Sequence, residues 1–554
     1  GISVDGMPVN MRTHAHGQGY ADLNFLIPEL VDRLLARKGP YWASEGDFSS
    51  AGAVHLTYAD RLEKNLIAAT GGSFGYWRGL AAGTMQLGGG ALTGAAEIER
   101  YNGPWDVPDG TAKYNGVLRY SQGTADNGFS ITGMAYTNRW HATNHIASRA
   151  VDQGLIGRFG TLDPSDAGDS QRYSLSGRWS RKDERSADRV EAYFVASTLN
   201  LFNNFTYYMD DPVNGDQFQQ SDKRKMYGLN ASHTTFHQLA GRATENVVGF
   251  QLRHDSIDLG LFNTVQRMPT NTIRTDHVEE TSASLYLEEK VTWTDWLRST
   301  AGLRGDLFWT GDTTAFLPQP KAGLVFGPFA RTEFYVNAGL GYHSNDVRGL
   351  AQGAPLLVSS RGAEVGVRTQ AVRGLDSSVA LFLLDFDSEL VFAGDSGDTS
   401  PAPASRRIGV EWTNRWRPLA WLALDGDLAY TQARFRDGTF IPSAPALVAS
   451  AGATVGEETG WFGALRWRYF GARPLTPDGS VASGATSLVN ARAGYTFESG
   501  VKVTLDALNV LNTQADQVTY YYESQLRGEP APVADTHFHP VEPLAFRLTV
   551  AKAF

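Results

Sequence analysis

Cysteine is absent from all 554 residues of the sequence. This absence excludes a disulfide scaffold and any metal site built on thiolates. Charged residues are also scarce, at 19% of the chain, and no run of about 18 apolar residues occurs, which excludes a membrane-spanning helix. The alternating pattern of a transmembrane β-barrel passes such a hydropathy test unnoticed, so that class of protein stays open.

The formal net charge of -10 argues against a nucleic-acid partner, because phosphate binding needs a positive face. The sequence also lacks the nucleophile motif Gly-x-Ser-x-Gly, the phosphate loop Gly-x-x-x-x-Gly-Lys-Ser/Thr and the zinc motif His-Glu-x-x-His. We therefore expect a protein that is not an enzyme. No Pro- or Ser-rich linker divides the chain, so one very large domain is possible despite its length.

The sequence is rich in glycine, at 59 positions, and aromatic residues make up 11% of it. So much glycine does not suit a helical protein and indicates many strands and turns. In residues 297–308 apolar side chains fall on one face, while Arg304 and Asp306 fall on the other, and residues 333–343 and 501–507 alternate in the same way. This pattern fits a soluble sandwich with its polar face in water, or an outer-membrane barrel with its apolar face in lipid.

The spacing of short turns favours the barrel. Turns near residues 294–295, 372–374 and 498–500 belong to a series separated by roughly 35 to 45 residues, which fits two strands and one longer loop each time. Tryptophan and tyrosine cluster at strand ends, as in an interfacial girdle. The last alternating segment finishes at Phe554 and resembles the sorting signal of bacterial outer-membrane barrels. We expect the outer membrane of a Gram-negative bacterium.

Four motifs carry a resemblance to a known family. Residues 2–10, 28–41 and 45–56 form an ordered series that is similar to the second half of the plug domain of TonB-dependent receptors. Near the other end, residues 505–512 resemble the penultimate-strand Asn-Leu-Phe-Asn motif of that family. Together with the alternating pattern, the resemblance covers the whole chain.

The resemblance implies an all-β membrane protein. Residues 1–58 would be the C-terminal part of a plug domain, and residues 59–554 would form a 22-stranded antiparallel transmembrane β-barrel around it. The family imports scarce nutrients: a ferric siderophore or another metal chelate is expected here, with cobalamin or a saccharide as alternatives. The resemblance implies no required cofactor, since a metal ion or chelate would be cargo. The implied partners are TonB in the full-length protein, the ligand, and outer-membrane lipid and lipopolysaccharide.

The competing interpretation is a passive outer-membrane channel or a surface structural or adhesion barrel. The plug motifs argue against it, because a passive channel needs no internal domain. The family's TonB box and the first half of its plug would precede Gly1, so we expect the printed sequence to be truncated there. We also expect shortened loops in residues 309–320 and 349–359.

Two His-x-His pairs are the candidate metal ligands: His14 with His16, and His537 with His539. Residues i and i+2 of a strand point the same way, so each pair could present two imidazoles together. In the plug topology of the family, the first pair lies in a loop facing outside, and the second precedes the final strand. We expect all four in one external vestibule, binding a metal or its chelate, or else hydrogen-bonded between plug and barrel.

Five further residues are candidate ligand contacts: Arg12, His343, Asp346, Tyr207 and Tyr208. The tyrosines could stack on a flat or sugar-like ligand or belong to the girdle. Residues 210–216 superficially suggest a calcium loop, but a turn is expected because their spacing departs from the EF-hand pattern. We also expect the plug cations to pair with carboxylates of the barrel wall. The cations are Arg33, Arg37 and Lys38, and the carboxylates are Glu288, Glu289, Asp306 and Glu333.

Overall fold

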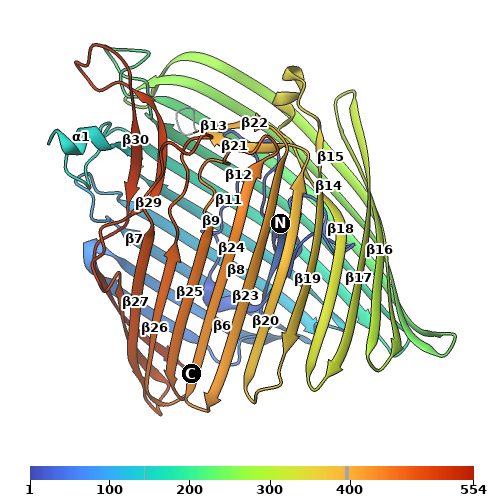
Figure 1. Cartoon of the computed structure of the whole chain (residues 1–554). Helices are drawn as coiled ribbons and strands as arrows, with labels where there is room; N and C mark the ends of the chain where they lie inside the picture. The colour runs from blue at the N-terminus through green and yellow to red at the C-terminus, as the bar shows by residue number, and fades with distance from the viewer. Residues whose placement is uncertain (142–143, 394–397) are drawn as a thin grey trace.

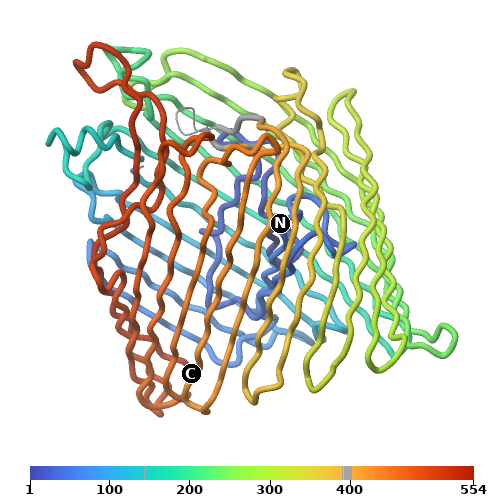
Figure 2. The backbone as a smooth tube through the Cα atoms, viewed as in Figure 1, coloured from blue at the N-terminus to red at the C-terminus, as the bar shows by residue number. Residues whose placement is uncertain are grey.

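The computed structural model describes residues 1–141, 144–393 and 398–554. In these residues twenty-two strands close into one antiparallel barrel, with a separate four-stranded sheet inside it (Figure 1). The chain starts within the barrel and ends at one rim (Figure 2). No helix of the described residues is long and apolar enough to cross a membrane. The closed barrel confirms the predicted fold class and rules out the soluble sandwich.

The internal sheet, which we call the plug, has the strand order β2-β1-β4-β3. Its elements are β1 (Ile2–Val4), β2 (Met7–Pro8), β3 (Val31–Lys38), β4 (Gly52–Tyr58) and the 3₁₀ turn η1 (Pro28–Leu30). Val4, Met7 and Ile27 are buried and pack in one apolar cluster with the wall residues Val117 and Met226. Burial of these side chains holds the plug against the wall, because removing apolar area from water is favourable.

The barrel strands follow the chain in order and close where the last strand meets the first, β31 against β5. The first half consists of β5 (Leu66–Gly72), β6 (Trp77–Leu87), β7 (Gly90–Tyr101), β8 (Thr111–Gly123), β9 (Gly128–Trp140), β11 (Ala167–Lys182), β12 (Ser186–Asn203), β13 (Phe218–Leu239), β14 (Arg242–Val265), β15 (Met268–Thr294) and β16 (Leu297–Thr310). The second half consists of β17 (Thr313–Phe329), β18 (Thr332–Ser344), β19 (Leu357–Thr369), β20 (Leu375–Phe386), β23 (Ser405–Leu419), β24 (Leu422–Phe435), β25 (Leu447–Gly456), β26 (Gly460–Phe470), β27 (Thr486–Thr496), β28 (Val501–Leu508) and β31 (Ala545–Ala553).

The two ends of the barrel differ in their connections. At one end, the turn end, the longest connection between barrel strands is residues 370–374, whereas at the other, the loop end, residues 509–544 join β28 to β31. The loop end carries the remaining elements: β10 (Ile146–Ala147), α1 (Ser148–Asp152), β21 (Glu389–Ala393), β22 (Asp398–Ala402), β29 (Asp516–Ser524), β30 (Val533–Pro540), η2 (Ser73–Gly75) and η3 (Val347–Gln352). Short turns at one end and long loops at the other are the predicted asymmetry.

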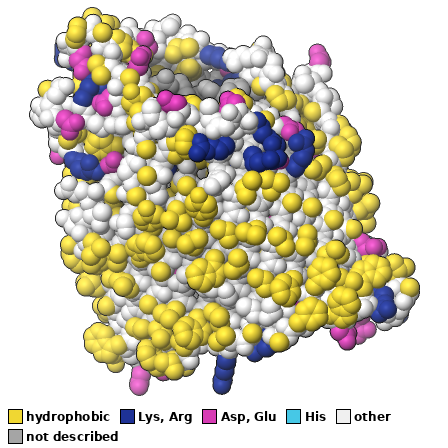
Figure 3. Space-filling model, in the orientation of Figure 1, with side chains coloured by type: hydrophobic (Ala, Val, Ile, Leu, Met, Phe, Trp, Pro, Cys, Tyr) yellow, Lys and Arg dark blue, Asp and Glu magenta, His cyan; other side chains and the backbone are white. Residues whose placement is uncertain are grey.

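Strand parity separates the two faces of the wall. On β16, Leu303 and Leu307 are 52% and 40% exposed, whereas Arg304 and Asp306 are 2% and 0% exposed. The leucines therefore point outward, and the charged residues point into the lumen against the plug. Hydrophobic side chains gather in a broad band on the outer face of the strands (Figure 3).

Wall glycines make room for the plug at Pro40. A Cβ atom at Gly339 would lie 2.4 Å from the carbonyl oxygen of Pro40, and one at Gly362 would lie 2.6 Å from the Pro40 ring. A side chain at either position would thus push the plug away from the wall. The two segments expected to be shortened are a tight hairpin between β16 and β17, turning at residues 311–312, and the η3 segment leading into β19.

Candidate functional site

Histidine and aromatic side chains line a pocket of about 440 Å³ at the loop end of the barrel, which we call the loop-end pocket. The plug, the barrel rim and the long loops all contribute to it. Its lining side chains in the described residues are His16, Trp105, Asp109, Trp140, His141, Asn144, His145, Leu201, Asn203, Phe205, Val518, Tyr520, His539 and Glu542.

The connection from β7 to β8 supplies one side of the pocket. Trp105 Nε1 donates a hydrogen bond to Asp109 Oδ2 at 3.0 Å, and the indole lies 4.8 Å from the ring of His539. Burial lowers the pKa of His539 to about 4, so its imidazole is neutral at pH 7. Glu542 accepts a hydrogen bond from the Tyr101 hydroxyl at 2.7 Å. This side therefore presents a neutral imidazole, an indole and two carboxylates.

A small sheet with the order β10-β30-β29, the loop-end sheet, supplies Val518, Tyr520 and His539. Arg149 of α1 fastens it: its Nε donates to Glu529 Oε1 and its backbone N–H to Asp535 Oδ2, both at 2.9 Å. Nη2 of the same guanidinium donates to Glu529 Oε2 at 2.9 Å, and such a bidentate Arg–carboxylate bond is strong and directional. The long loop that contains the sheet is thus held in one conformation beside the pocket.

His537 stabilises the loop-end sheet from inside and does not line the pocket. Its side chain is fully buried, stacks on Tyr522 with 3.7 Å between ring centroids, and places Nε2 2.7 Å from Ser524 Oγ. Burial lowers its pKa to about 3. A neighbouring histidine, His145, stacks on Phe205 at 4.6 Å and does line the pocket.

The plug supplies the floor through His16, whose Nδ1 lies 2.8 Å from Gln220 Oε1 of β13. His14 turns away from the pocket and stacks on Tyr20 at 4.2 Å, with Nε2 3.7 Å from Asp222 Oδ2. Burial lowers the pKa of His14 to about 3, outweighing the opposite effect of Asp222. His14 is therefore a neutral packing residue between plug and wall.

The i and i+2 argument fails for the first pair, because residues 14–16 form a turn rather than a strand. The His16 backbone N–H donates to His14 Nδ1 at 3.0 Å, and the two rings have separate partners, Tyr20 for His14 and Gln220 for His16. Within residues 1–141, 144–393 and 398–554, no group of three or more His, Asp or Glu side chains is arranged to hold a metal ion. His16 and His539 share the pocket as predicted by topology, but the four histidines do not form one metal centre.

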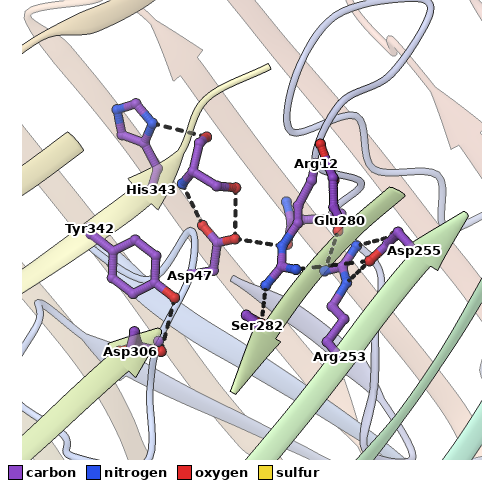
Figure 4. Close-up of polar contacts among 12 residues, drawn as sticks. Arg12, Asp47, Arg253, Asp255, Glu280, Ser282, Asp306, Tyr342 and His343 are labelled. Atoms are coloured by element: carbon purple, nitrogen blue, oxygen red, sulfur yellow. Dashed lines mark hydrogen bonds and ion pairs between the residues drawn. The ribbon is translucent and has the colours of Figure 1, made fainter. Parts of the chain in front are cut away.

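Below the pocket, an ion-pair network joins the plug to the wall (Figure 4). Arg12 of the plug donates from Nε to Asp47 Oδ2 at 2.9 Å and from Nη2 to Ser282 Oγ at 2.7 Å. On β14, Arg253 makes a bidentate bond to Asp255 at 2.7 and 2.9 Å. Arg12 is thus a buried structural residue under the pocket, and we call this set with its neighbouring arginines and aspartates the lumen network.

The wall arginines of this network also bind backbone carbonyl groups of the plug. Arg253 donates to the carbonyl of Asn10 at 3.1 Å, and Arg224 donates to the carbonyl of Thr13 at 2.5 Å. Each arginine also forms an ion pair with an aspartate two residues away on its own strand, as Arg224 does with Asp222 at 2.8 Å. The aspartates therefore balance the charge of the wall arginines, and the guanidinium N–H groups that remain bind the plug backbone.

The expected pairing of plug cations with wall carboxylates is wrong in most details. Lys38 does pair with a wall carboxylate, that of Glu411, at 2.5 Å, but Arg37 pairs with the plug residue Glu45. In the described chain, no ion pair forms at Arg33. The expected wall carboxylates have other partners or positions: Glu288 pairs with Lys290, Asp306 with Arg304, and Glu333 with Arg298 and Arg368, while Glu289 lies on the exposed outer face. The negative charge of these wall carboxylates is thus largely neutralised by arginine and lysine residues of the wall itself.

The other predicted contacts do not line the pocket. Asp346 caps η3 by accepting the Arg348 N–H at 2.9 Å, and Arg348 Nη2 donates to the His14 carbonyl at 2.9 Å. His343, at the end of β18, places its Nδ1 3.3 Å from the carbonyl of Ser344. These contacts tie a loop-end turn to the tip of the plug.

The aromatic segment after β12 supports the pocket from behind. Tyr207 is buried, and its hydroxyl donates to the carbonyl of His145 at 3.2 Å. Tyr208 lies beside the Arg527 guanidinium, 5.8 Å from ring to charge. Residues 210–216 form a turn, as expected, in which Asp216 accepts backbone N–H groups, among them that of Asp211 at 2.7 Å.

Sequence reasoning did not find Trp105, Asp109, His141, His145 or Glu542. They lie on three loops that are far apart in the sequence, and none belongs to an alternating pattern. One signal was present: Trp105 and Asp109 lie in the non-alternating segment 102–110, between two alternating segments. A tryptophan and a carboxylate in such a loop are typical of a binding surface.

A barrel that encloses its own plug, with a pocket shared by plug and loops, defines the class of plugged transmembrane β-barrels. The family model described as TonB dependent receptor-like, beta-barrel, matches residues 100–512. The chain therefore belongs to the TonB-dependent receptor family, which is a family of transport receptors and not of enzymes.

Solved structures share this fold over the whole chain. The unliganded ferric citrate transporter FecA is 15% identical with a TM-score of 0.81, and 88% of its chain is covered. The siderophore receptor PiuA from Acinetobacter baumannii is 12% identical (TM-score 0.80, 89% covered), and the copper transporter OprC is 15% identical (TM-score 0.78, 90% covered). This chain is covered to 100% in all three. No curated protein matches the sequence.

Proposed function

We propose that the protein is a TonB-energised receptor of the Gram-negative outer membrane that takes up a metal chelate through the loop-end pocket. The observation that carries the proposal is that the plug and the loops build the pocket together: His16 comes from the plug, and His539 from the loop-end sheet. A ligand held there touches the plug directly. Binding outside can therefore be sensed by the element that must move for transport.

The class of chelate follows from the lining. Two carboxylates, Asp109 and Glu542, and no Lys or Arg belong to the described lining, and His539 is neutral at pH 7. Such a pocket repels a polyanion, whereas aromatic and imidazole rings pack well on a neutral or cationic chelate. The structurally similar proteins include transporters for ferric citrate and copper, which supports metal as the cargo. An uncharged chelate such as a ferric trihydroxamate fits the lining best.

The competing function, a passive channel, is disfavoured by the lumen network. Buried ion pairs and hydrogen bonds hold the plug across the lumen, and a passive channel has no use for such an obstruction. TonB is the proposed partner, since the family uses it to move the plug.

Binding to the purified protein tests the proposal. Ferric chelates quench tryptophan fluorescence, and Trp105 and Trp140 line the pocket. We expect a neutral ferric cyclic trihydroxamate to bind about tenfold more tightly than a triply anionic ferric tris-catecholate. In a His16→Ala/His539→Ala variant, affinity for the neutral chelate should fall about tenfold.

His233→Ala is the matched control, because this histidine lies on the outer face of β13 and pairs with Asp188. It should bind the chelate as the unmodified protein does. Tighter binding of the anionic chelate would overturn the charge assignment. Failure of every chelate to bind would overturn metal uptake itself.

A further inference from the structure

Four outward-facing residues form one row across four neighbouring strands near the loop end. Arg361 of β19 lies opposite Asp385 of β20, Asp385 lies opposite Arg406 of β23, and Arg406 lies opposite Arg434 of β24. Opposite residues of antiparallel strands point to the same face, so this register places all four side chains side by side on the outer wall. A fifth residue, Arg436, joins the row from the loop after β24. We call this set the arginine row.

The row carries more positive than negative charge. Arg406 makes a bidentate bond to Asp385 at 2.7 and 2.9 Å, and Arg436 shares the same carboxylate at 2.9 Å. Arg361 pairs with Asp387 at 3.0 Å. Arg434 lies over the ring of Phe440, 3.2 Å from its centroid, and has no carboxylate partner in the described chain. Four guanidinium groups thus face two carboxylates, and two positive charges remain unbalanced.

The row lies at the upper edge of the hydrophobic band. Toward the turn end on the same outward face, Leu381, Ile408 and Val365 are 57%, 51% and 50% exposed. Figure 3 shows Lys and Arg side chains gathered directly above the hydrophobic side chains of these strands. Surplus cations at the edge of an apolar band correspond to the depth of lipid headgroups, where phosphate is found.

The outer wall at β13 to β15 has no such surplus. Near the loop end of β13, β14 and β15, Lys223 lies opposite Asp258, and Asp258 lies opposite His277. His277 contacts both Asp258, at 2.7 Å, and Glu279, at 3.0 Å. The cations there are matched by carboxylates, so β13 to β15 do not share the unbalanced charge of β19 to β24.

We propose that the arginine row is a binding site for the phosphorylated headgroup of a membrane lipid in the loop-end leaflet. Guanidinium groups bind phosphate through two parallel N–H bonds, which a row of neighbouring arginines can offer to one phosphoryl group or to two adjacent ones. The acyl chains of the same lipid lie on the hydrophobic side chains below. The site is separate from the loop-end pocket, because its residues face outward and the pocket faces the lumen.

Lipid binding to the full chain in nanodiscs tests the proposal. The nanodiscs contain phosphatidylcholine alone, and bisphosphorylated lipid A is titrated in and counted by native mass spectrometry. We expect an Arg406→Gln/Arg434→Gln variant to bind lipid A about tenfold more weakly than the unmodified protein. Lys223→Gln/Lys225→Gln is the matched control: it removes two cations from the outer face of β13 and should change binding less than about twofold.

Two further arms separate the sources of phosphate. Lipid A without its phosphates should bind no better to the unmodified protein than to the arginine variant. Inorganic phosphate at millimolar concentration should not displace bound lipid A, because it cannot use the hydrophobic band. Equal loss of binding in the two double variants, no loss in either, or displacement by inorganic phosphate would overturn the proposal. Slow migration of the heated form and fast migration of the unheated form on a gel verify that each variant barrel has folded.

Discussion

Arginine and aspartate lie side by side on both faces of the barrel wall, in the lumen at β13 and β14 and on the outside at β19 to β24, and the two sets have opposite consequences. In the lumen network the side chains of Arg224 and Asp255 are 0% exposed, whereas in the arginine row those of Arg361 and Arg406 are 57% and 43% exposed. A buried ion must be paired, since desolvation costs several kcal/mol per charge. An exposed ion can keep unbalanced charge. Strand parity therefore decides whether an arginine holds the plug or is free to meet a ligand from the membrane.

The largest expected effect comes from Asp255→Asn in the lumen. Asp255 faces Arg253, Arg224 and Arg12 at 2.7, 3.5 and 4.0 Å, so its loss leaves buried guanidinium groups without balancing charge. Breaking a buried pair in this way costs about 3–5 kcal/mol. We expect a lower midpoint of urea unfolding and faster proteolysis of the plug in the folded barrel.

Asp258→Asn is the control, because this residue lies three positions along the same strand and points outward. It should change the midpoint little, since exposed pairs contribute about 0–1 kcal/mol. If the two variants unfold at the same urea concentration, the lumen network does not hold the plug.

An intermediate effect is expected at His537, which is buried like the lumen network but meets no carboxylate among the described residues. In the opened sheet its imidazole titrates near 6.5, and in the closed sheet near 3. Between these values only the opened sheet binds the proton, so lowering the pH favours opening by about 1.4 kcal/mol per unit. The contribution is fully present above pH 6.5 and is lost as the pH falls toward 3.

Amide hydrogen exchange in β29 and β30 between pH 7 and 4.5 measures this opening. A His537→Phe variant keeps the stack on Tyr522 and cannot be protonated, so the slope of protection against pH should become shallower by about 1.4 kcal/mol per unit. His277→Phe, on the outer face, should leave the slope in β29 and β30 unchanged. Equal slopes in the His537 variant and the unmodified protein would show that the protonation of this histidine does not change when the sheet opens.

How much of this could be read from the sequence depends on the periodicity of each region. The alternation in residues 297–308 predicted both faces of β16 correctly, including the inward positions of Arg304 and Asp306. The spacing Arg-x-Asp recurs at Arg253 and Asp255, and strand parity alone places both on one face. The lumen network was therefore visible in principle as charged pairs on the polar face of predicted strands.

The loop-end pocket could be predicted only in part. Topology placed His16 and His539 together, but the orientation of His14 depends on a turn, and the burial of His537 depends on Tyr522 from another strand. Trp105 and Glu542 line the same pocket although more than four hundred residues of chain separate them, and no local pattern predicts that they share it. Loops are held by tertiary contacts rather than by periodicity, which is why the site was harder to predict than the barrel.

The smallest expected effect on stability comes from Asp385→Asn in the arginine row, the same substitution as in the lumen. Asp385 also lies between two arginines, Arg406 and Arg436, each at 2.7 to 2.9 Å. Asp385 is itself only 7% exposed, but its two guanidinium partners reach water, so solvent replaces the lost carboxylate and the cost should be about 1 kcal/mol. The substitution also removes a negative charge beside the proposed headgroup site. Lipid A should then bind several-fold more tightly in the nanodisc titration, while the urea midpoint moves little. A loss of stability as large as that of Asp255→Asn would mean that water does not compensate the arginines for the lost carboxylate of Asp385, and the contrast between the two faces of the wall would no longer hold.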